Sequence, residues 1–286
     1  MDNGQLIKKL RKERGISQAQ LSNGISTRTT LSSFENKKSK IPSDILFEYL
    51  KRMNISPEEY SFYLNNDSKS EKEYALQYFN ENIYKAKEYE IRQRIHNYQK
   101  KYKDYNDFFF CCLSIELKLF LNKSQEDNVF DVKEDTEIIK NYLNSIQQWG
   151  HFEISLFSNC LYIFNSDYIR ATFKILFKKT KNLSQIDSYK NDVSIFINNC
   201  IILSFERNEL NDANTYINSL SDISNGSPRK TYDKLMCNYY KELLHQITIQ
   251  ENKLMKSIAT FRELGFSDHA NRLDKFKIKI LSNYIK

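Results

Sequence analysis

The spacing of apolar residues predicts helices along almost the whole chain. Leu6, Ile7 and Leu10 recur three and four positions apart, which places them on one face of a helix. From residue 70 onward the same spacing continues, with short polar interruptions between the apolar segments. In this part the pattern predicts helices over residues 70–82, 84–102, 104–122, 132–149, 151–164, 166–181, 188–206, 209–224, 229–248, 251–264 and 268–284.

Start and stop signals divide the first 65 residues into five short helices. Gly15 follows the first apolar stripe at a position where helices commonly end. Ser17 and Gln20 have the spacing of a capping box, and Thr27 can cap the next helix. Further start signals occur at Pro42-Ser43 and at Ser56-Pro57-Glu58-Glu59. Two short helices separated by a four-residue turn fit a helix-turn-helix layout.

Composition supports an all-α chain with more than one domain. The 286 residues include only six Gly and three Pro, too few for the frequent turns of a β-sandwich or barrel. The glycines form no phosphate-binding motif. Helices of similar length with short connections predict antiparallel pairs that stack in sequence, as in tetratricopeptide-like repeats. The last predicted helix is unusually apolar for an end piece, so we expect a partner, such as a second copy of the chain, to bury it.

Charge is concentrated at the start of the chain. The net charge is +7, and residues 1–40 contain nine Lys and Arg against three acidic residues. A basic block beside a nearly neutral bulk favours a polyanionic partner for the N-terminus, although a solvated basic face would give the same charge pattern.

Several function classes are disfavoured. The five cysteines are odd in number and lie in apolar contexts, which predicts reduced, buried side chains in a cytoplasmic protein. Neither a signal peptide nor a membrane span is expected, because the apolar runs are too short. The four histidines are dispersed without metal-ligand spacing, and no nucleophile motif is present. We therefore expect no catalysis, no metal and no cofactor.

The first 65 residues resemble the XRE (Cro/repressor-like) helix-turn-helix domain. The resemblance rests on Gly15-Ile16-Ser17-Gln18-Ala19-Gln20-Leu21 and on Leu31-Ser32-Ser33-Phe34-Glu35-Asn36. In such a domain the third helix enters the major groove, where Arg28 can contact guanine through two hydrogen bonds. The basic residues after this helix can neutralise phosphates, whereas Glu35 is expected to pair with a basic residue of the first helix. The predicted DNA-binding residues are Gln18, Arg28, Thr29, Thr30, Ser33, Lys37, Lys38 and Lys40; the hydroxyl residues among them could equally serve only in capping and solvation.

The rest of the chain resembles the Rgg family of Gram-positive quorum-sensing regulators. The strings that carry this resemblance are Ile146-Gln147-Gln148-Trp149-Gly150-His151-Phe152-Glu153, Leu156-Phe157-Ser158-Asn159-Cys160, Ile197-Asn198-Asn199-Cys200-Ile201-Ile202 and Phe261-Arg262-Glu263-Leu264-Gly265. The resemblance implies a homodimer whose helical-repeat domain binds a short peptide pheromone on its concave face. Peptide binding then changes transcription.

Asparagine side chains are the first candidates for such a peptide site, because one amide can both donate to and accept from a peptide backbone. Asn159 and Asn199 lie in matching contexts, each before a cysteine in an apolar segment. Tyr162, Arg170 and Tyr239 could line the same groove, with Arg170 facing a peptide carboxylate. A coding bias toward Asn, Lys, Ile and Tyr would also produce many surface asparagines, so this set is a hypothesis.

Together these patterns predict a helix-turn-helix domain over residues 1–65 and a peptide-binding and dimerisation domain over residues 66–286. The predicted function is sequence-specific binding of promoter DNA under the control of a short intracellular peptide. The alternative is a helical-repeat protein that sequesters a partner protein and does not bind DNA; the uneven charge argues against it.

Overall fold

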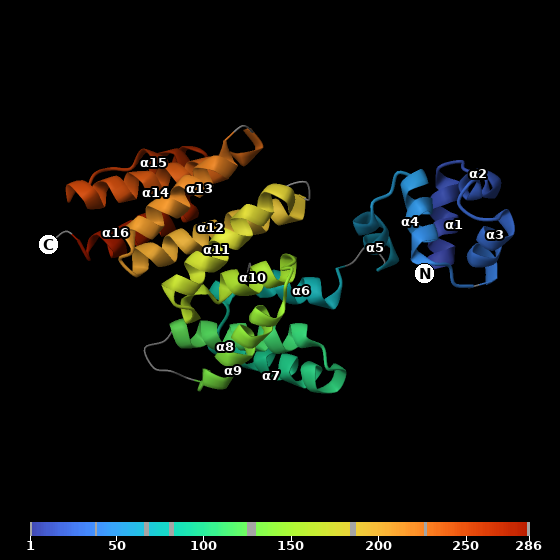
Figure 1. Cartoon of the computed structure of the whole chain (residues 1–286), viewed down its shortest axis with the longest axis horizontal. Helices are drawn as coiled ribbons and strands as arrows, with labels where there is room; N and C mark the ends of the chain where they lie inside the picture. Colours follow the sequence, from blue (N-terminus) through green and yellow to red (C-terminus); the bar gives the residue numbers. More distant parts are fainter. Residues whose placement is uncertain are drawn as a thin grey trace. The chain divides into compact units, whose positions relative to one another are not determined.

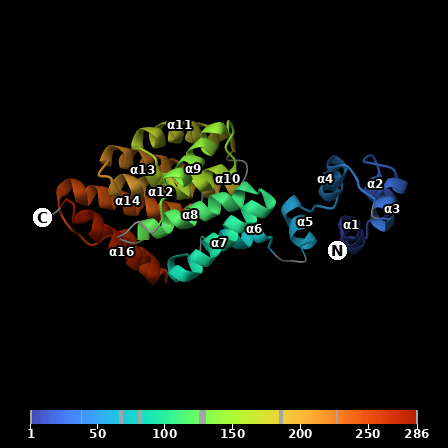
Figure 2. The same cartoon turned by 90° about the horizontal axis from the view of Figure 1, so that it is seen from below.

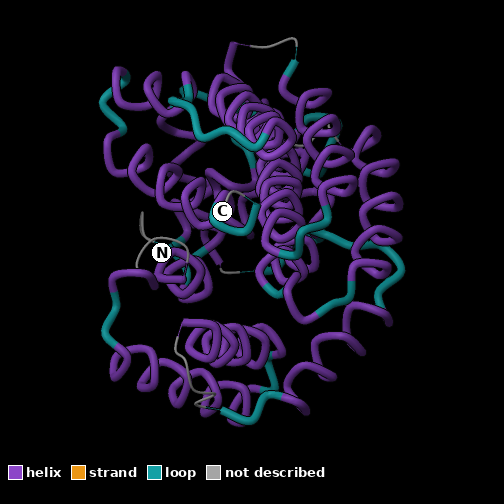
Figure 3. The backbone as a smooth tube through the Cα atoms, turned by 90° about the vertical axis from the view of Figure 1, so that its left-hand side faces the viewer, coloured by secondary structure: helices purple, strands orange, loops and turns teal. Residues whose placement is uncertain are grey.

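A computed structural model describes residues 2–37, 39–65, 69–79, 83–124, 130–183, 187–225 and 228–284, with 84, 124, 179–183 and 187–190 described by their backbone only. Within these ranges the secondary structure is helical and contains no strand (Figure 3). The prediction of an all-α chain is therefore confirmed. The chain divides into two compact units, residues 1–87 and 88–286. The predicted functional boundary after residue 65 stays a prediction.

The first unit begins with five short helices, as the cap signals predict. They are α1 (Asn3–Glu13), α2 (Gln18–Ser22), α3 (Arg28–Lys37), α4 (Ser43–Arg52) and α5 (Pro57–Leu64), followed by α6 (Glu71–Gln77) and the 3-10 helix η2 (Ile83–Lys85). The capping box of Ser17 and Gln20 is present, and Gly15 has a φ of 65°, the left-handed region that suits glycine after a helix. The Thr27 side chain accepts from the backbone N–H of Thr30 at 3.0 Å. These signals fix where the short helices begin and end.

The second unit contains longer helices stacked in sequence order (Figure 1). They are α7 (Glu88–Tyr105), α8 (Phe108–Ser124), α9 (Lys133–Ser145), α10 (His151–Asn159), η3 (Leu161–Ile163), α11 (Ser166–Leu183), α12 (Asp187–Glu206), α13 (Leu210–Ser224), η4 (Pro228–Lys230), α14 (Thr231–Ile249), α15 (Lys256–Glu263) and α16 (Ser267–Leu281). In this unit α10 packs on α12, α12 on α13 and α13 on α14 (Figure 2). This is the stacking that the predicted helical repeat requires.

Polar side chains join helices whose residues lie 41 to 43 positions apart in the sequence, a spacing that we take as one repeat. Asn159 Nδ2 donates to Glu116 Oε1 at 2.9 Å across 43 residues, and Asn199 Nδ2 donates to Ser158 Oγ at 2.9 Å across 41 residues. A third link joins α11 to α13 across 42 residues, between Arg170 Nη1 and Asp212 Oδ2. The matching contexts of Asn159 and Asn199 thus reflect equivalent positions in successive repeats.

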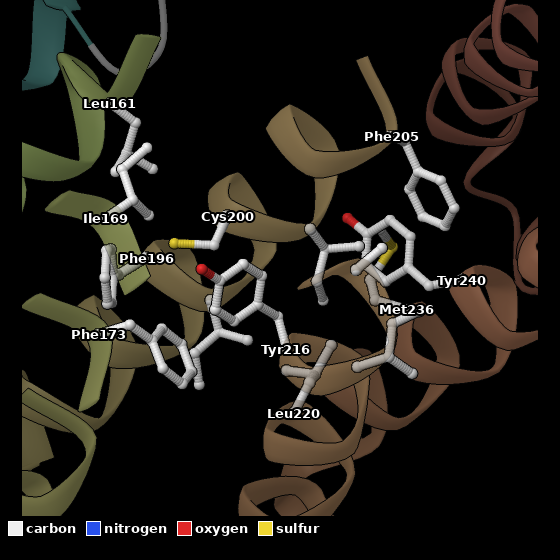
Figure 4. Close-up of a cluster of buried hydrophobic side chains, with 14 of the residues drawn as sticks. Leu161, Ile169, Phe173, Phe196, Cys200, Phe205, Tyr216, Leu220, Met236 and Tyr240 are labelled. Atoms are coloured by element: carbon white, nitrogen blue, oxygen red, sulfur yellow. The ribbon is translucent and has the colours of Figure 1, made fainter. Parts of the chain in front are cut away.

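One hydrophobic core continues from α8 to α16 in the second unit. Figure 4 shows part of it, where Phe173 and Phe196 lie to one side of Cys200 and Met236 and Tyr240 to the other. All five cysteines are buried and free of disulfides, which confirms their predicted state. Among the described residues, no helix is both long enough and apolar enough to cross a membrane.

One helix start in this unit differs from the sequence prediction. The helix predicted over 251–264 starts only at Lys256, because Gln250 adopts a left-handed conformation and the Gln246 side chain holds the following segment through the backbone of Lys253. The apolar face of α16 is mostly covered within the chain, where Leu273, Ile280 and Leu281 are buried. Ile278 of the same helix is exposed, and the expectation that a partner buries this helix stays a prediction.

Candidate functional site

A buried ion pair fixes the geometry of α1, α2 and α3. Arg11 on α1 donates from Nε and Nη2 to the two carboxylate oxygens of Glu35 on α3, at 2.6 and 2.8 Å. Arg11 Nη1 also donates to the carbonyl of Ile16 just before α2, and Gln18 Nε2 donates to Glu35 at 2.8 Å. One carboxylate therefore links three helices. The expectation that Glu35 pairs with a basic residue of the first helix is confirmed.

The same network sets the charge state of Glu35. Burial by itself would raise the pKa of this carboxyl, but hydrogen bonds from Arg11 and Gln18 and the charges of Arg11 and Lys8 outweigh burial, so the pKa is lowered. The carboxylate is therefore ionised at neutral pH. A charge that is buried at this depth is tolerated because an opposite charge pairs with it and hydrogen bonds satisfy both carboxylate oxygens.

The predicted DNA-binding side chains lie mainly on the exposed face of α3 and in the segment that follows it. Arg28, Thr29, Lys37 and Lys40 are exposed, and Thr30 and Ser33 are half-buried. The Thr30 hydroxyl lies 2.8 Å from that of Thr27, so capping already engages it. Gln18 is half-buried and engaged by Glu35. Lys38 lies outside the described residues.

Arg52 stabilises the turn between α2 and α3, a role that the sequence did not indicate. From α4 its Nη1 donates to the carbonyls of Gln20 at 3.2 Å and Leu21 at 3.1 Å, and to that of Asn23. These are the carbonyls that the end of α2 leaves without helical partners. Arg52 therefore caps α2 from a neighbouring helix.

In the second unit, a groove of about 580 Å³ lies between α12, α14 and α16. Each helix contributes residues three and four positions apart, that is, one complete face. Its lining residues are Asn191, Ser194, Ile195, Asn198, Asn199, Ile202, Tyr232, Asp233, Met236, Tyr239, Tyr240, His269, Arg272, Leu273 and Phe276. The groove is mainly apolar, with a few polar groups that could orient a ligand.

Two of the five predicted peptide-binding residues line this groove. Asn199 does so, and so does Tyr239, whose buried hydroxyl donates to the carbonyl of Leu273 at 2.8 Å. The other three lie elsewhere: Asn159 bonds Glu116, and Arg170 pairs with Asp167 and Asp212, both at 2.5 Å. Tyr162 lies in η3 beneath the ammonium group of Lys123. The structure thus brings Asn199 and Tyr239 together and leaves the other three apart from them.

Three polar atoms of groove residues have no hydrogen-bond partner among the described residues. They are Asn198 Oδ1, Tyr240 OH and His269 Nε2, and each atom is buried. Leaving such atoms unpaired costs about 1–3 kcal/mol each, so a buried unpaired group calls for an explanation. Sequence reasoning noted the asparagine-rich string around Asn198 but missed Tyr240 and His269, because nothing local indicates that α16 lies against α12 and α14.

Glu116 is a buried carboxyl to which no cation among the described residues is paired. Burial raises its pKa to about 8, although the hydrogen bond from Asn159 acts in the opposite direction. A carboxyl whose pKa is raised by folding stabilises the protein fully below its unfolded pKa, near 4.5, and loses that contribution as the pH rises through about 8.

Glu116→Gln is therefore expected to be more stable than the wild type at pH 8.5 by at least about 1 kcal/mol, and to lose less stability between pH 5.5 and 8.5. Thermal unfolding at the two pH values measures both effects. Glu137→Gln, at an exposed position on α9, is the control and should keep the wild-type pH dependence. The same pH dependence of stability in Glu116→Gln and in the wild type would contradict a raised pKa of Glu116.

Among the described residues, no three His, Cys, Asp or Glu side chains are grouped so that they could hold a metal ion. Each unit contains one candidate site: α3 with the exposed Arg28 and Lys37 in the first, and the mainly apolar groove in the second.

Comparison with known families decides the identity of the chain. The model of the C-terminal domain of the HTH-type transcriptional regulator Rgg matches residues 92–275, and a helix-turn-helix model matches residues 7–60. The chain belongs to the Rgg family of transcriptional regulators. The resemblance seen in the sequence is confirmed, and the Rgg domain model covers α8 to α15 and most of α7 and α16.

Solved structures share the fold of this Rgg-family chain. A transcriptional regulator from Listeria monocytogenes EGD-e is 21% identical with a TM-score of 0.83, covering 99% of this chain and 98% of that one. The SHP pheromone receptor Rgg2 of Streptococcus dysgalactiae is 20% identical with a TM-score of 0.69, covering 97% and 99%. PrgX in complex with iCF10 is 16% identical with a TM-score of 0.69, covering 99% and 97%. At these identities the likeness concerns the fold.

Proposed function

We propose that this Rgg-family protein binds promoter DNA through its N-terminal helices and is controlled by a short peptide bound in the groove between α12, α14 and α16. We also propose that it acts as a homodimer, since helix-turn-helix proteins read paired half-sites about one helical turn apart. The observation that carries the proposal is the groove, whose mainly apolar lining includes a few polar side chains, in a chain that also contains a helix-turn-helix.

The arrangement of α3 supports the DNA-binding half. Arg28 and Thr29 are exposed in its first turn, where residues of a recognition helix face base edges. Lys37 and Lys40 are exposed at its far end and beyond, where they can meet phosphates. The network of Arg11, Glu35 and Gln18 keeps α3 in a fixed orientation relative to α2.

The chemistry of the groove and two similar proteins support the peptide half. Asn198 and Asn199 are adjacent amides on the α12 face, suited to the donors and acceptors of a peptide backbone. The structures described as an SHP pheromone receptor and as a PrgX/iCF10 complex concern proteins of this fold. By extension, we place Asn199 in contact with the peptide, assign the buried Tyr239 to joining α14 and α16 through Leu273, and keep Asn159, Tyr162 and Arg170 as residues that join the repeats.

A gel-shift titration of the full-length protein on the DNA upstream of its own coding sequence tests the proposal. Affinity should fall steeply with salt, because each neutralised phosphate releases counterions. Binding that is absent at low salt would refute the DNA-binding half and favour regulation through a partner protein.

Arg28→Ala and Lys37→Ala should weaken DNA binding in different ways. Loss of Arg28 is expected to reduce the binding free energy by about 1–3 kcal/mol and to relax the base preference at one operator position. Loss of Lys37 should weaken binding to all sequences alike, and should reduce by about one the slope of the logarithm of the binding constant against the logarithm of the salt concentration. Competition binding against a panel of single-base operator variants, at several salt concentrations, separates the two. Equal effects on sequence preference would contradict these roles.

A further inference from the structure

We propose that α11 and the segment between α9 and α10 form a docking surface for an acidic amphipathic helix of a partner protein. The surface combines a cavity with apolar and aromatic walls, an exposed apolar ridge at its mouth, and two exposed lysines along that ridge. It shares no residue with the groove between α12, α14 and α16, and Figure 2 shows α11 on the other side of α12 from α16. The inference therefore depends on neither the proposed peptide binding nor the proposed promoter binding.

A cavity of about 300 Å³ forms the centre of this surface, between the end of α9, the segment that follows it, α10 and α11. Its lining is mainly apolar and aromatic, and includes Leu143, Ile146, Trp149, Ile154, Tyr168 and Leu176. A cavity of this size and lining can take one large apolar side chain of a partner, such as leucine or phenylalanine.

Hydrogen bonds within the protein hold the two aromatic rings of the cavity in place. Trp149 Nε1 donates to the carbonyl of Leu143 at 3.1 Å, and the Tyr168 hydroxyl donates to Asn144 Oδ1 at 2.7 Å. The Trp149 ring also packs against Phe157, with ring centroids 5.2 Å apart. Because these polar groups already have partners, the cavity favours an apolar side chain over a polar one.

The surface continues beyond the cavity along the exposed side of α11. Ala171 and Ile175 line the cavity and are also exposed, Ile175 by 57%. Lys174 and Lys178 are exposed three positions from these two residues, so they lie along the edge of the same ridge. A small apolar molecule could fill the cavity but would leave the ridge and the lysines uncovered. A segment of a partner chain covers all three, as an amphipathic helix does in a groove.

The charges on this side of α11 select an acidic partner. Its carboxylate, Asp167, is already paired with Arg170. No carboxylate of a described residue pairs with Lys174 or Lys178. The two lysines lie one helical turn apart, and two glutamates one turn apart on a partner helix have the same separation. A helix with one large apolar side chain and two such glutamates on the same face therefore complements the surface.

Three sets of designed peptides test the surface. All are sixteen-residue helices of Ala and Gln with blocked ends and a fluorescent label. The first set contains one Leu or Phe and two Glu one turn apart on the same face. The second set replaces both Glu by Gln, and the third replaces the Leu or Phe by Ala. Fluorescence anisotropy with the full-length protein gives the Kd of each set.

The wild type is expected to bind the first set about fivefold more tightly than the second and about tenfold more tightly than the third. The double variant Lys174→Gln, Lys178→Gln should lose the preference for Glu over Gln. Ile175→Glu places a carboxylate at the mouth of the cavity and should abolish binding of the first set. Lys275→Gln, at an exposed position of α16 outside both the cavity and the groove, should bind as the wild type does. Thermal unfolding verifies that each variant is folded.

Three results would overturn the inference. The first is an absence of binding, or equal affinity for the three sets, in the wild type. The second is a preference that persists in the lysine and isoleucine variants, because the peptides would then bind elsewhere, for instance in the groove. The third is loss of a dimer in Ile175→Glu, measured by light scattering, because the surface would then be an interface between two copies of the chain.

Discussion

Glu35→Gln is expected to lower the free energy of unfolding of the N-terminal unit by about 3–5 kcal/mol, because it leaves the buried guanidinium of Arg11 without a counter-charge. Glu35 is 3% exposed and joins α1, α2 and α3 through Arg11 and Gln18. Hydrogen exchange followed by mass spectrometry reports the protection of these helices separately from that of the second unit. DNA affinity should fall as well, since α3 loses its fixed orientation.

Glu13→Gln is the matched control. It removes a carboxylate from α1 whose pairing with Lys9 is exposed and therefore worth little. The pH dependence gives an independent check. Since the pKa of Glu35 is lowered by folding, its contribution is present above the ordinary value of 4.5 and is lost as the pH falls through the folded value. Protection that is unchanged in Glu35→Gln would show that the ion pair is dispensable.

Gly4→Ala is expected to destabilise the N-terminal unit by at least about 1–3 kcal/mol. This loss outweighs the gain of about 1 kcal/mol that alanine normally brings to a helix. A Cβ at this position would lie 2.0 Å from the carbonyl oxygen of Phe34 and 2.9 Å from its carbonyl carbon. These are backbone atoms of α3, so no side chain can rotate away. The two helices would have to separate.

Lys9→Ala provides the comparison for Gly4→Ala, since it places alanine on the exposed face of α1. The Gly4 variant should lose protection in both α1 and α3 and bind DNA more weakly, while the Lys9 variant should keep its protection. If Gly4→Ala kept full protection in α3, the close approach of the two helices would be refuted.

The helices of this protein could be predicted from local signals, and their bounds were accurate where a cap marked them. Ser17, Thr27 and Ser56 each accept a backbone N–H as predicted. Where no cap residue was present, the bounds shifted: the helix predicted over 84–102 runs from Glu88 to Tyr105. The start of α15 was missed because Lys277, distant in sequence, donates to the carbonyl of Lys253 at 2.7 Å and so helps hold the preceding segment in place.

The candidate groove was harder to foresee than the helices. The asparagine pattern directed attention to α12, and Asn199 lines the groove. The charge of Arg170 suggests contact with a peptide carboxylate, but its actual partners, Asp167 and Asp212, cannot be inferred from spacing along the chain. Arg272 and His269 could not be foreseen as groove residues, because only the packing of α14, α15 and α16 brings them to the same surface as Asn198. The periodicity of apolar residues identifies which face of a helix is buried, but it does not identify the helix that this face contacts.

The links that join positions 41 to 43 residues apart also determine how such a chain can change in length. An insertion or deletion of a few residues within a helix would move donors out of register with acceptors one repeat away. Loss or duplication of one complete repeat would preserve the spacing of these links. The stacked helices can therefore be lengthened or shortened without disturbing these links only by whole repeats.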